Sequence, residues 1–510
     1  MSHSGRPAAT EVRGRLLARN TLLNLVGLGA PILVAVAAIP AVVRGLGEER
    51  FGILAIAWMV IAYLGELGVG RATTKFVAEA LGAGDVRAAA ETAWTATALQ
   101  AIFGLVCGIG LAVATPFLVG GVLNIPPELG AEARAAFLWL AAGLPIVIVA
   151  AAWRGVLEAA QRFDLISAVR IPSTIANYVL PLGAVAVGWA LPGVMALLVA
   201  ARAGTLAALW ALAYRAVPAL RQGPALARGR LRALAGYGGW VSLSSVVAPA
   251  LVYLDRFVLG VLASMSAVAY YAAPYEVVNR LAILPASVVG ALFPALSALG
   301  GQAQWERIRR LASLSVKVIL LLVAPFAVLL IGGASELLGW WLGPEFAANS
   351  ASALVILTLG IVANAVAQVP YTLLQGVGRA DVTAKFHLLE LPIHAALVWV
   401  LVGRWGIVGA ALSWTIRIAL DAALLFWAAA RLAGFTPRVL VDEGVARTAA
   451  LVSVTLAAAV ALERGAVGSG VRVVLLLALL GALAITSWRL ALSAADRERL
   501  AGAVRLAGRR

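Results

Sequence analysis

Residues 92–119 read TAWTATALQAIFGLVCGIGLAVATPFLV and contain no charged side chain. A helix that crosses a bilayer needs about 20 mostly apolar residues, so this segment is long enough to span one. The rest of the chain has the same character, because 62% of its 510 residues are hydrophobic and 13% are charged. A soluble domain carries roughly a quarter charged residues. The sequence therefore predicts an all-α membrane protein.

Fourteen segments of this kind can be recognised along the chain. Their limits are 20–43, 51–76, 92–119, 133–156, 165–187, 189–213, 237–261, 267–297, 313–335, 350–376, 382–403, 405–431, 446–462 and 470–489. They are too long and too uniformly apolar for the strands of a membrane barrel, which alternate at every second residue. We expect no cleavable signal peptide, because a basic N-terminal tail leads directly into the first span.

The distribution of positive charge predicts the orientation. If the N-terminus is cytoplasmic, thirty of the 40 Lys and Arg residues fall on the inner side and six on the outer side. The positive-inside rule then places both termini in the cytoplasm. This distribution also accounts for the net charge of +16, so nucleic acid is not an expected partner. Cys107 is the only cysteine, which excludes an internal disulfide.

Two parts of the chain resemble each other. The pattern Leu-x4-Arg-x-Asp begins at Leu157 and again at Leu374, an offset of 217 residues, and similar motifs at 46–52 and 265–271 are offset by 219. We therefore expect two six-helix lobes related by a pseudo-two-fold axis along the membrane normal, with substrate between them. The expected divisions are a basic cytoplasmic tail at 1–19, an N-lobe at 20–213, a cytoplasmic linker at 214–236, a C-lobe at 237–432, two further spans at 446–489 and a basic tail at 490–510. The two further spans are either a lipid-facing pair or a groove for a lipid tail.

Several motifs, taken in order, resemble one family of transporters. They are Asn20, Asn24 and Pro31 in span one, Leu67-Gly68-x-Gly70 with Lys75 ending span two, Asp255-x-Phe257-x-x-Gly260 with Tyr270-Tyr271, and Gly376-x-Gly378-Arg379-x-Asp381 with Gly406-x-x-Gly409. Over most of residues 15–435 the chain resembles the polysaccharide transporter branch of the multidrug/oligosaccharidyl-lipid/polysaccharide exporters. It is similar to O-antigen and exopolysaccharide flippases.

The resemblance implies twelve to fourteen helices in two lobes around a central cavity. It also implies translocation of an undecaprenyl-diphosphate-linked oligosaccharide across the bacterial cytoplasmic membrane by alternating access, for surface polysaccharide such as lipopolysaccharide. The expected partners are this lipid-linked oligosaccharide, membrane lipids, a polysaccharide polymerase and a chain-length regulator. Span one carries no acidic residue, although the cation-coupled drug exporters of the superfamily commonly use one there. This departure disfavours the drug branch and leaves the coupling ion, H+ or Na+, open.

Charged residues inside spans mark the candidate site, because a charge in hydrocarbon must face a cavity or a partner. Arg280 lies four residues after Glu276, and Asp421 lies four residues after Arg417, so each pair shares a helix face. Each is either a structural ion pair or a cavity pair in which arginine meets phosphate and the carboxylate couples transport to an ion. Arg202 lies in the middle of its span and has no partner within its own helix.

Other titratable residues have open alternatives. His387, Glu390 and His394 share one helix face, which indicates polar packing or a proton-responsive face more than a metal site. Asp255 is expected to face the cavity or a gate, and Arg256 to extend to the outer interface. Arg71 and Lys75 either anchor the inner interface or attract a diphosphate to a basic entrance.

The predicted site therefore has two parts. The substrate-binding residues are Arg202, Arg280, Arg417, Arg71 and Lys75, and the coupling or gating residues are Glu276, Asp255, Glu390, His394 and Asp421. We find no phosphate-binding loop or catalytic motif, so we expect no enzyme activity, metal or cofactor, and transport drawing on an ion gradient or on substrate consumption outside. The alternatives are a cation-coupled multidrug antiporter, a flippase for a lipid-linked peptidoglycan precursor and, less favoured because the outer loops are short, a membrane-embedded glycosyltransferase or polymerase.

Overall fold

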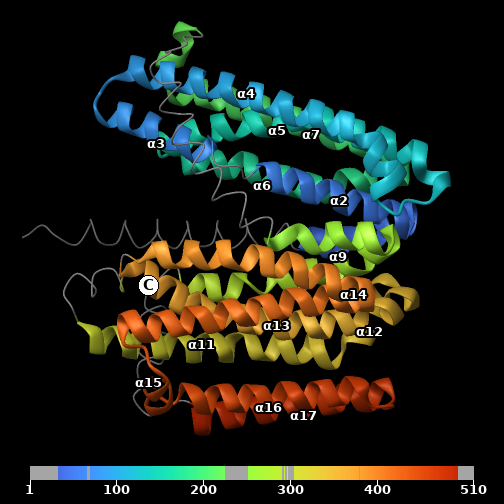
Figure 1. Cartoon of the computed structure of the whole chain (residues 1–510), viewed down its shortest axis with the longest axis vertical. Coiled ribbons are helices and arrows are strands. Elements are labelled where there is room, and N and C mark those ends of the chain that lie inside the picture. Colours follow the sequence, from blue (N-terminus) through green and yellow to red (C-terminus); the bar gives the residue numbers. More distant parts are fainter. Residues whose placement is uncertain are drawn as a thin grey trace, which may run out of the picture.

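A computed structural model of the chain describes residues 33–65, 69–223, 251–289, 292, 296, 304–377 and 379–491. All secondary structure in these residues is helical (Figure 1), which confirms the predicted fold class. Nine described helices are long and apolar enough to cross a membrane, and they cover ten predicted spans because α14 contains two. The other four predicted spans each extend into residues outside the described ranges.

The N-terminal group of helices runs from Leu33 to Gln222. It contains a helix at Leu33–Leu46, α2 (Glu48–Gly65), α3 (Val69–Gly82), α4 (Val86–Phe117), α5 (Gly130–Ala159), α6 (Phe163–Ala186) and α7 (Leu191–Ala216). A π-helix at Leu118–Val122 and short 3-10 helices at Pro127–Leu129 and Pro218–Gln222 complete it. The single predicted span at 51–76 corresponds to two helices, α2 and α3, and residues 66–68 between them lie outside the described part.

The C-terminal group contains a helix at 251–262, α9 (Met265–Arg280), a further turn of helix at 283–289, α11 (Trp305–Gly332), α12 (Ala334–Leu342), α13 (Pro344–Gly376) and α14 (Ala380–Ala433). The backbone reverses within α14 at Gly406, whose φ of 52° and ψ of −124° are readily adopted only by glycine. Two predicted spans, 382–403 and 405–431, are therefore the two halves of α14. The short α15 (Pro437–Asp442) leads to α16 (Val445–Arg464), α17 (Ser469–Thr486) and a π-helix at Ser487–Ala491.

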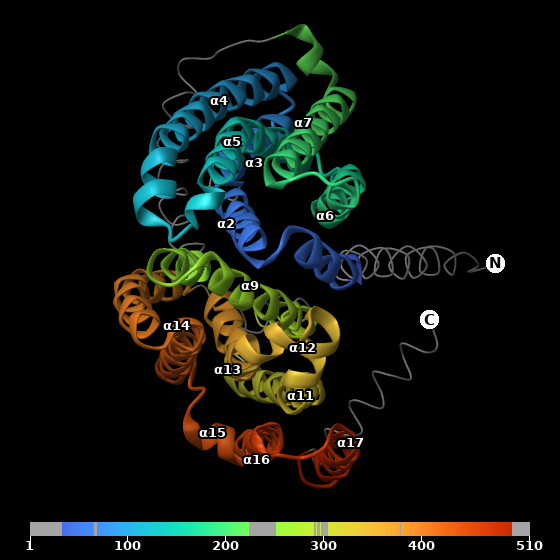
Figure 2. The ribbon, with the colours of Figure 1, turned by 90° about the vertical axis from the view of Figure 1, so that its right-hand side faces the viewer.

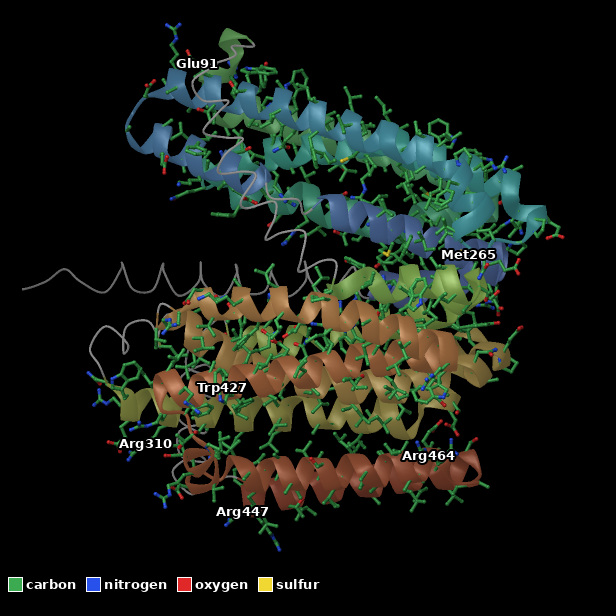
Figure 3. All side chains as sticks on the ribbon, in the orientation of Figure 1. Glu91, Met265, Arg310, Trp427, Arg447 and Arg464 are labelled. Atoms are coloured by element: carbon green, nitrogen blue, oxygen red, sulfur yellow. The ribbon has the colours of Figure 1, made fainter. Side chains whose placement is uncertain are left out.

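The two groups lie side by side, with α16 and α17 on the far side of the C-terminal group (Figures 1 and 2). The side-chain view places Glu91, Arg310 and Arg447 at one end of the helices and Arg464 at the opposite end (Figure 3). We call these the inner and outer ends, following the predicted orientation. The predicted limits of the two lobes stay a prediction, because most of the predicted linker lies outside the described residues.

The repeated Leu-x4-Arg-x-Asp motif has the same local structure in both groups. Arg162 Nε lies 2.9 Å from Asp164 Oδ1 where α5 gives way to α6, and Arg379 Nε lies 3.0 Å from Asp381 Oδ1 where α13 gives way to α14. Each arginine thereby fixes the turn that reverses the chain between two spans. The sequence similarity thus reflects equivalent places in the two groups.

The two groups are in contact at their outer ends. The Asn124 side-chain amide donates to the carbonyl oxygens of Val261 and Ala263 at 2.8 and 3.0 Å, and Trp341 Nε1 donates to the Val36 carbonyl at 2.6 Å. Helix α2 packs closely against α9, because Gly52 has no side chain to hold them apart. Nearly all hydrogen bonds between the two groups that the described residues show lie in this outer half, so the outer side is closed.

We expect Gly52→Ala to destabilise the protein by about 1 to 3 kcal/mol, as overpacking does in other cores. An added Cβ would lie 1.9 Å from the backbone oxygen of Met265, so α2 and α9 must separate. The temperature at which the monodisperse peak is lost in size-exclusion chromatography should fall. Gly110→Ala in α4 is the matched control, because its Cβ would meet no atom within 4 Å. Equal melting of both variants would contradict the close α2–α9 packing.

Candidate functional site

A cavity of about 170 Å³, which we call the central cavity, lies between the two groups. The N-terminal group lines it with Trp58, Met59, Ile61, Asn177, Tyr178 and Arg202, and the C-terminal group with Tyr253, Arg256 and Glu276. Ligand sites typically combine apolar and aromatic walls with a few placed polar groups. The central cavity has this composition and receives side chains from both groups, so we take it as the candidate site.

Two arginines bracket Glu276 at the edge of the central cavity. Arg256 Nη2 lies 3.3 Å from one carboxylate oxygen of Glu276, and Arg280 Nη2 lies 3.1 Å from the other. Arg256 also lies close to the carboxyl of Asp255, the preceding residue. The predicted contact between Glu276 and Arg280 is thus present, with a second cation that the spacing did not reveal.

The prediction that Arg256 extends to the outer interface is wrong. Arg256 is 3% exposed, and its guanidinium lies 4.5 Å from the ring centroid of Tyr275. The ion pair with Glu276 and the ring of Tyr275 compensate its loss of water. Both partners lie on α9, a helix that follows 251–262, so no pattern within Arg256's own helix indicates them.

Arg280 also joins the two groups, because its Nη2 donates to the Tyr178 hydroxyl of α6 at 2.9 Å. This is the deepest hydrogen bond between the groups among the described residues. A movement that separates α6 from α9 would break it and leave Arg280 with Glu276 alone.

Arg202 has only neutral partners among the described residues. Its guanidinium donates to Asn177 Oδ1 at 2.7 Å and to Ser173 Oγ at 3.4 Å. Hydrogen bonds satisfy its donors in part, but no described carboxylate balances its charge. A half-buried arginine without a counter-charge favours an anion in the adjoining space.

A second cavity, of about 240 Å³, adjoins Arg202 within the N-terminal group, and we call it the arginine cavity. It is lined by Ile61, Val147, Ala150, Ala151, Arg154, Ile166, Val169, Arg170, Ser173, Thr174, Arg202, Thr205 and Leu209. Arg154 lies 3.7 Å from Glu158, and Arg170 is exposed. Arg154, Arg170 and Arg202 lie on α5, α6 and α7, so only the packing of these helices brings them to one cavity.

The other two predicted substrate-binding residues lie on α3. Lys75 Nζ is 3.9 Å from Glu79 and the side chain is 43% exposed, which fits a place at the inner interface. The backbone of Arg71 belongs to α3, but its side chain lies outside the described residues. A basic entrance at Arg71 and Lys75 stays a prediction.

Buried polar groups gather between the two halves of α14. Glu390 Oε2 lies 3.4 Å from Arg417 Nη1, and the Asp421 carboxyl lies beside Glu390. His394 is fully buried, and neither ring nitrogen has a hydrogen-bond partner among the described residues. The expected pairing of Arg417 with Asp421 is therefore replaced by an ion pair with Glu390, because the reversal at Gly406 brings the two halves of α14 together.

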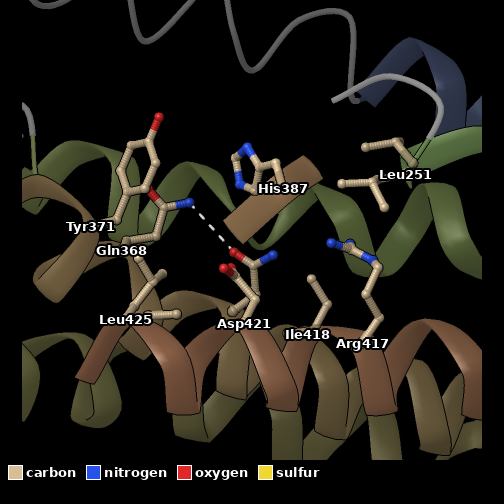
Figure 4. A pocket seen from close by; sticks show the side chains of 11 residues that line it. Leu251, Gln368, Tyr371, His387, Arg417, Ile418, Asp421 and Leu425 are labelled. Atoms are coloured by element: carbon tan, nitrogen blue, oxygen red, sulfur yellow. Dashed lines mark hydrogen bonds between the residues drawn. The ribbon is translucent and has the colours of Figure 1, made fainter. Parts of the chain in front are cut away.

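Arg417, Asp421 and His387 also line a cavity of about 320 Å³ in the C-terminal group, together with Gln368 and Tyr371. Arg417 and Asp421 rise from one helical segment into the space that His387 faces (Figure 4). This cavity is separate from the central cavity. Arg417 therefore does not share a cavity with Arg202 in this conformation.

Asp255 is fully buried and lines none of the cavities described above. The Tyr271 hydroxyl donates to one carboxylate oxygen, and the Arg256 backbone N–H donates to the other at 2.7 Å. The side chain thus connects helix 251–262 to α9. Both partners of Asp255 belong to the C-terminal group, so Asp255 makes no direct contact across the outer closure. A gating role for Asp255 stays a prediction.

Three further residues join the groups at the outer end. The Tyr270 hydroxyl contacts the carboxylates of Glu48 from α2 and Glu345 from α13, the second at 3.0 Å. Arg50 beside them is paired with Glu132 at 2.8 Å. Burial raises the pKa of Glu48, the Tyr270 hydroxyl opposes this shift, and the carboxylates of Glu345 and Glu49 reinforce it.

Helices that can span a bilayer, arranged in two groups around a positively charged cavity closed on one side, define a multi-pass membrane transporter. The profile of the polysaccharide biosynthesis protein family matches residues 17–299, more than half of the chain, and the MatE family profile matches 241–400. The chain belongs to the polysaccharide biosynthesis protein family, as the motifs predicted.

Individual proteins agree with this assignment. A Shigella flexneri protein with the provisional name of O-antigen transporter is 28% identical over 418 residues, which cover 80% of this chain and 96% of that protein. The fold is similar to that of the lipid II flippase MurJ in an inward closed conformation, with a TM-score of 0.69, 12% identity and coverage of 92% and 99%. It is also similar to an inward-facing multidrug resistance transporter of the MATE family, with a TM-score of 0.67, 16% identity and coverage of 81% and 95%.

The outer closure should depend on pH. Tyr270 has one hydroxyl proton but contacts two carboxylates, so both contacts are hydrogen bonds only when one carboxyl is protonated. The pKa of Glu48 is raised above its usual 4.5 in the closed conformation, so protonation of Glu48 favours closure. Closure should therefore be favoured at low pH and should weaken as the pH rises through the pKa that Glu48 has in the closed conformation. Spin labels at Glu128→Cys and Ala348→Cys, in a Cys107→Ala background, would measure the separation of the outer ends by electron resonance between about pH 5 and pH 8.

The distance distribution should broaden towards longer separations at the higher pH. In Glu345→Gln the side-chain amide is neutral at every pH and donates its own N–H to the Tyr270 hydroxyl. No carboxylate then has to be protonated, so this variant should stay closed over the whole pH range. An identical response in the wild type and in Glu345→Gln would contradict a proton-dependent closure.

Proposed function

We propose that this protein is a flippase that moves an undecaprenyl-diphosphate-linked oligosaccharide from the inner to the outer leaflet of the bacterial cytoplasmic membrane, for surface polysaccharide assembly. Membership of the polysaccharide biosynthesis protein family and the O-antigen transporter relative support a polysaccharide cargo. The observation that carries the proposal is Arg202, which lines the central cavity and has no carboxylate partner among the described residues.

An anionic cargo explains the position of Arg202. Arginine presents a planar fork of donors that matches phosphate oxygens, and charge-assisted bonds are strong away from bulk water. Arg202 has no carboxylate partner among the described residues, so a phosphate of the cargo would supply the missing negative charge. Arg280 would exchange its neutral partner Tyr178 for the cargo when the groups move apart.

The closed outer end fits the loading stage of alternating access. Cargo would enter from the inner leaflet while the contacts of Asn124, Trp341 and Tyr270 hold the outer ends together. These hydrogen bonds lie beside the apolar packing of α2 against α9, and a rocking movement would exchange both for contacts at the inner ends. In this proposal both termini are cytoplasmic.

The buried cluster on α14 supports coupling to protons. One arginine, Arg417, offsets only one of the neighbouring carboxyls of Glu390 and Asp421, so the second needs a proton or another cation. His387 lines the cavity of about 320 Å³ in the C-terminal group, and His394 is buried on the same helix face. In this role Arg417 acts with the coupling residues.

We expect Arg280→Gln and Arg202→Gln each to reduce surface polysaccharide at least tenfold, because a charged hydrogen bond contributes about 1.5 to 3 kcal/mol. Polymer would be quantified on whole cells, with membrane insertion checked by immunoblot of isolated membranes. Arg87→Gln is the control, because this side chain is 81% exposed at the inner end.

Normal polymer in both cavity variants would overturn the assignment of the central cavity. A change in resistance to cationic dyes without a change in polymer would instead favour the multidrug antiporter.

We expect Glu390→Gln to abolish the stimulation of flipping by a proton gradient, because an amide cannot bind and release a proton. Flipping of a fluorescent lipid-linked saccharide would be measured in proteoliposomes with and without the gradient. Glu128→Gln is the control, because Glu128 is exposed in the outer loop. A gradient response that survives in Glu390→Gln would exclude this cluster as the coupling site.

A further inference from the structure

The central cavity and the arginine cavity adjoin one another. Ile61 of α2 and Arg202 of α7 line both of them. Pockets for drug-sized ligands typically measure about 300 to 1,000 Å³. Neither cavity reaches this size alone, at about 240 and 170 Å³, but the two together do. They are therefore two compartments suited to two parts of one ligand.

The arginine cavity has the chemistry of a phosphate site. Three arginines, Arg154, Arg170 and Arg202, and three hydroxyl groups, from Ser173, Thr174 and Thr205, line it, and none of its lining residues is acidic. Guanidinium and hydroxyl groups are the donors that bind the non-bridging oxygens of phosphate groups. The Thr174 hydroxyl donates to the Arg170 carbonyl and the Thr205 hydroxyl to Ser173 or Ala201, so the arginines would supply most of these donors. Arg170 has no ion-pair partner among the described residues, and Arg202 has only neutral ones. The cavity therefore favours a dianion or a more highly charged group.

The central cavity has a different chemistry. Trp58 and Tyr178 meet edge to face with their ring centroids 5.6 Å apart, and Tyr253 faces them from the other group. The indole N–H of Trp58 has no hydrogen-bond partner among the described residues. Asn177 and Glu276 add planar polar groups with paired donors or acceptors. A sugar ring needs this combination, because its C–H faces are apolar and its hydroxyl groups donate and accept hydrogen bonds.

We infer that the two cavities divide the cargo between them, with the diphosphate in the arginine cavity and the first sugar ring in the central cavity. This inference rests on the proposed function and specifies how the cargo lies. Arg202 stands at the junction and would bind the phosphate that carries the sugar. The lipid chain, joined to the other phosphate, would leave past α6, where Phe163 and Arg170 are exposed.

This arrangement assigns binding roles to residues on four different helices. Arg154 of α5 and Arg170 of α6 read the diphosphate, which every cargo of this class shares. Trp58 of α2, Asn177 of α6 and Tyr253 contact the sugar, so they would set the preference for its identity. The variable part of the cargo thus lies where both groups of helices meet, and its size would influence how far they close.

The test is the binding of two probes to the purified full-length protein in nanodiscs. One probe is farnesyl diphosphate and the other is farnesyl-diphosphate-linked N-acetylglucosamine, measured by calorimetry. Arg154→Gln/Arg170→Gln should weaken both probes about tenfold or more. Trp58→Leu should weaken only the sugar-linked probe, about five- to tenfold, because the diphosphate does not contact it. Arg87→Gln, exposed at the inner end, should change neither.

Two further arms identify the source of the phosphate. Inorganic diphosphate should compete with farnesyl diphosphate in the wild type and lose this effect in the double arginine variant. Nanodiscs with and without phosphatidylglycerol should give the same affinities; competition by this lipid would assign the cavity to a phospholipid head group and overturn the inference. If the double variant fails to fold, Arg170→Gln alone replaces it, because the described residues show no ion pair of Arg170. This single variant should weaken the binding of both probes.

The outcomes separate this inference from the proposed function. If neither probe binds the wild type, the proposed cargo class fails. If both bind but Trp58→Leu weakens them equally, or the arginine variants leave farnesyl diphosphate unchanged, the cargo class stands and the division between the cavities is wrong.

Discussion

The cost of placing charge in hydrocarbon governs this structure. Water is absent around the middle of the spans, so each buried guanidinium or carboxylate must find a partner within the protein. Glu276 serves two arginines, Glu390 serves Arg417, and Arg202 has only neutral partners among the described residues. In the first two arrangements each arginine has a carboxylate partner, whereas Arg202 has none among the described residues. The cost of burying charge therefore stabilises the fold where arginine and carboxylate pair, and favours binding of an anion at Arg202.

Closure on the outer side depends on a different kind of contact. Gly52 allows α2 and α9 to touch backbone to backbone, and a few hydrogen bonds from Asn124, Trp341 and Tyr270 fix the position. Each such bond is worth on the order of 1 kcal/mol, because water replaces it when the ends separate. The apolar packing of α2 against α9 adds to these bonds, so opening the outer end must exchange both kinds of contact for others at the inner end.

The candidate site shows which side-chain pairs can be predicted from spacing. Glu276 and Arg280 lie one helical turn apart, so their contact follows from the geometry of one helix. Arg256 and Arg417 found partners 20 and 27 residues away, on other helical segments, and these contacts could not be predicted from periodicity. Arg154 and Arg170 follow the inner-side pattern of basic residues, which does not indicate that they lie beside Arg202. Their place beside Arg202 is decided by the packing of α5, α6 and α7.

The sequence by itself determined that the protein spans a membrane, where most of its helices lie, that one short motif recurs in both halves, and which family it resembles. These features follow from local properties: the length of apolar runs, the positions of basic residues and the recurrence of short motifs. Only the tertiary structure decided which buried charges meet, that the outer ends are closed, and that an arginine-lined cavity adjoins an aromatic one. Such features depend on distances between helices that are far apart in the chain. The sequence does not show which helices pack together, because the bilayer requires an apolar lipid-facing surface on all of them.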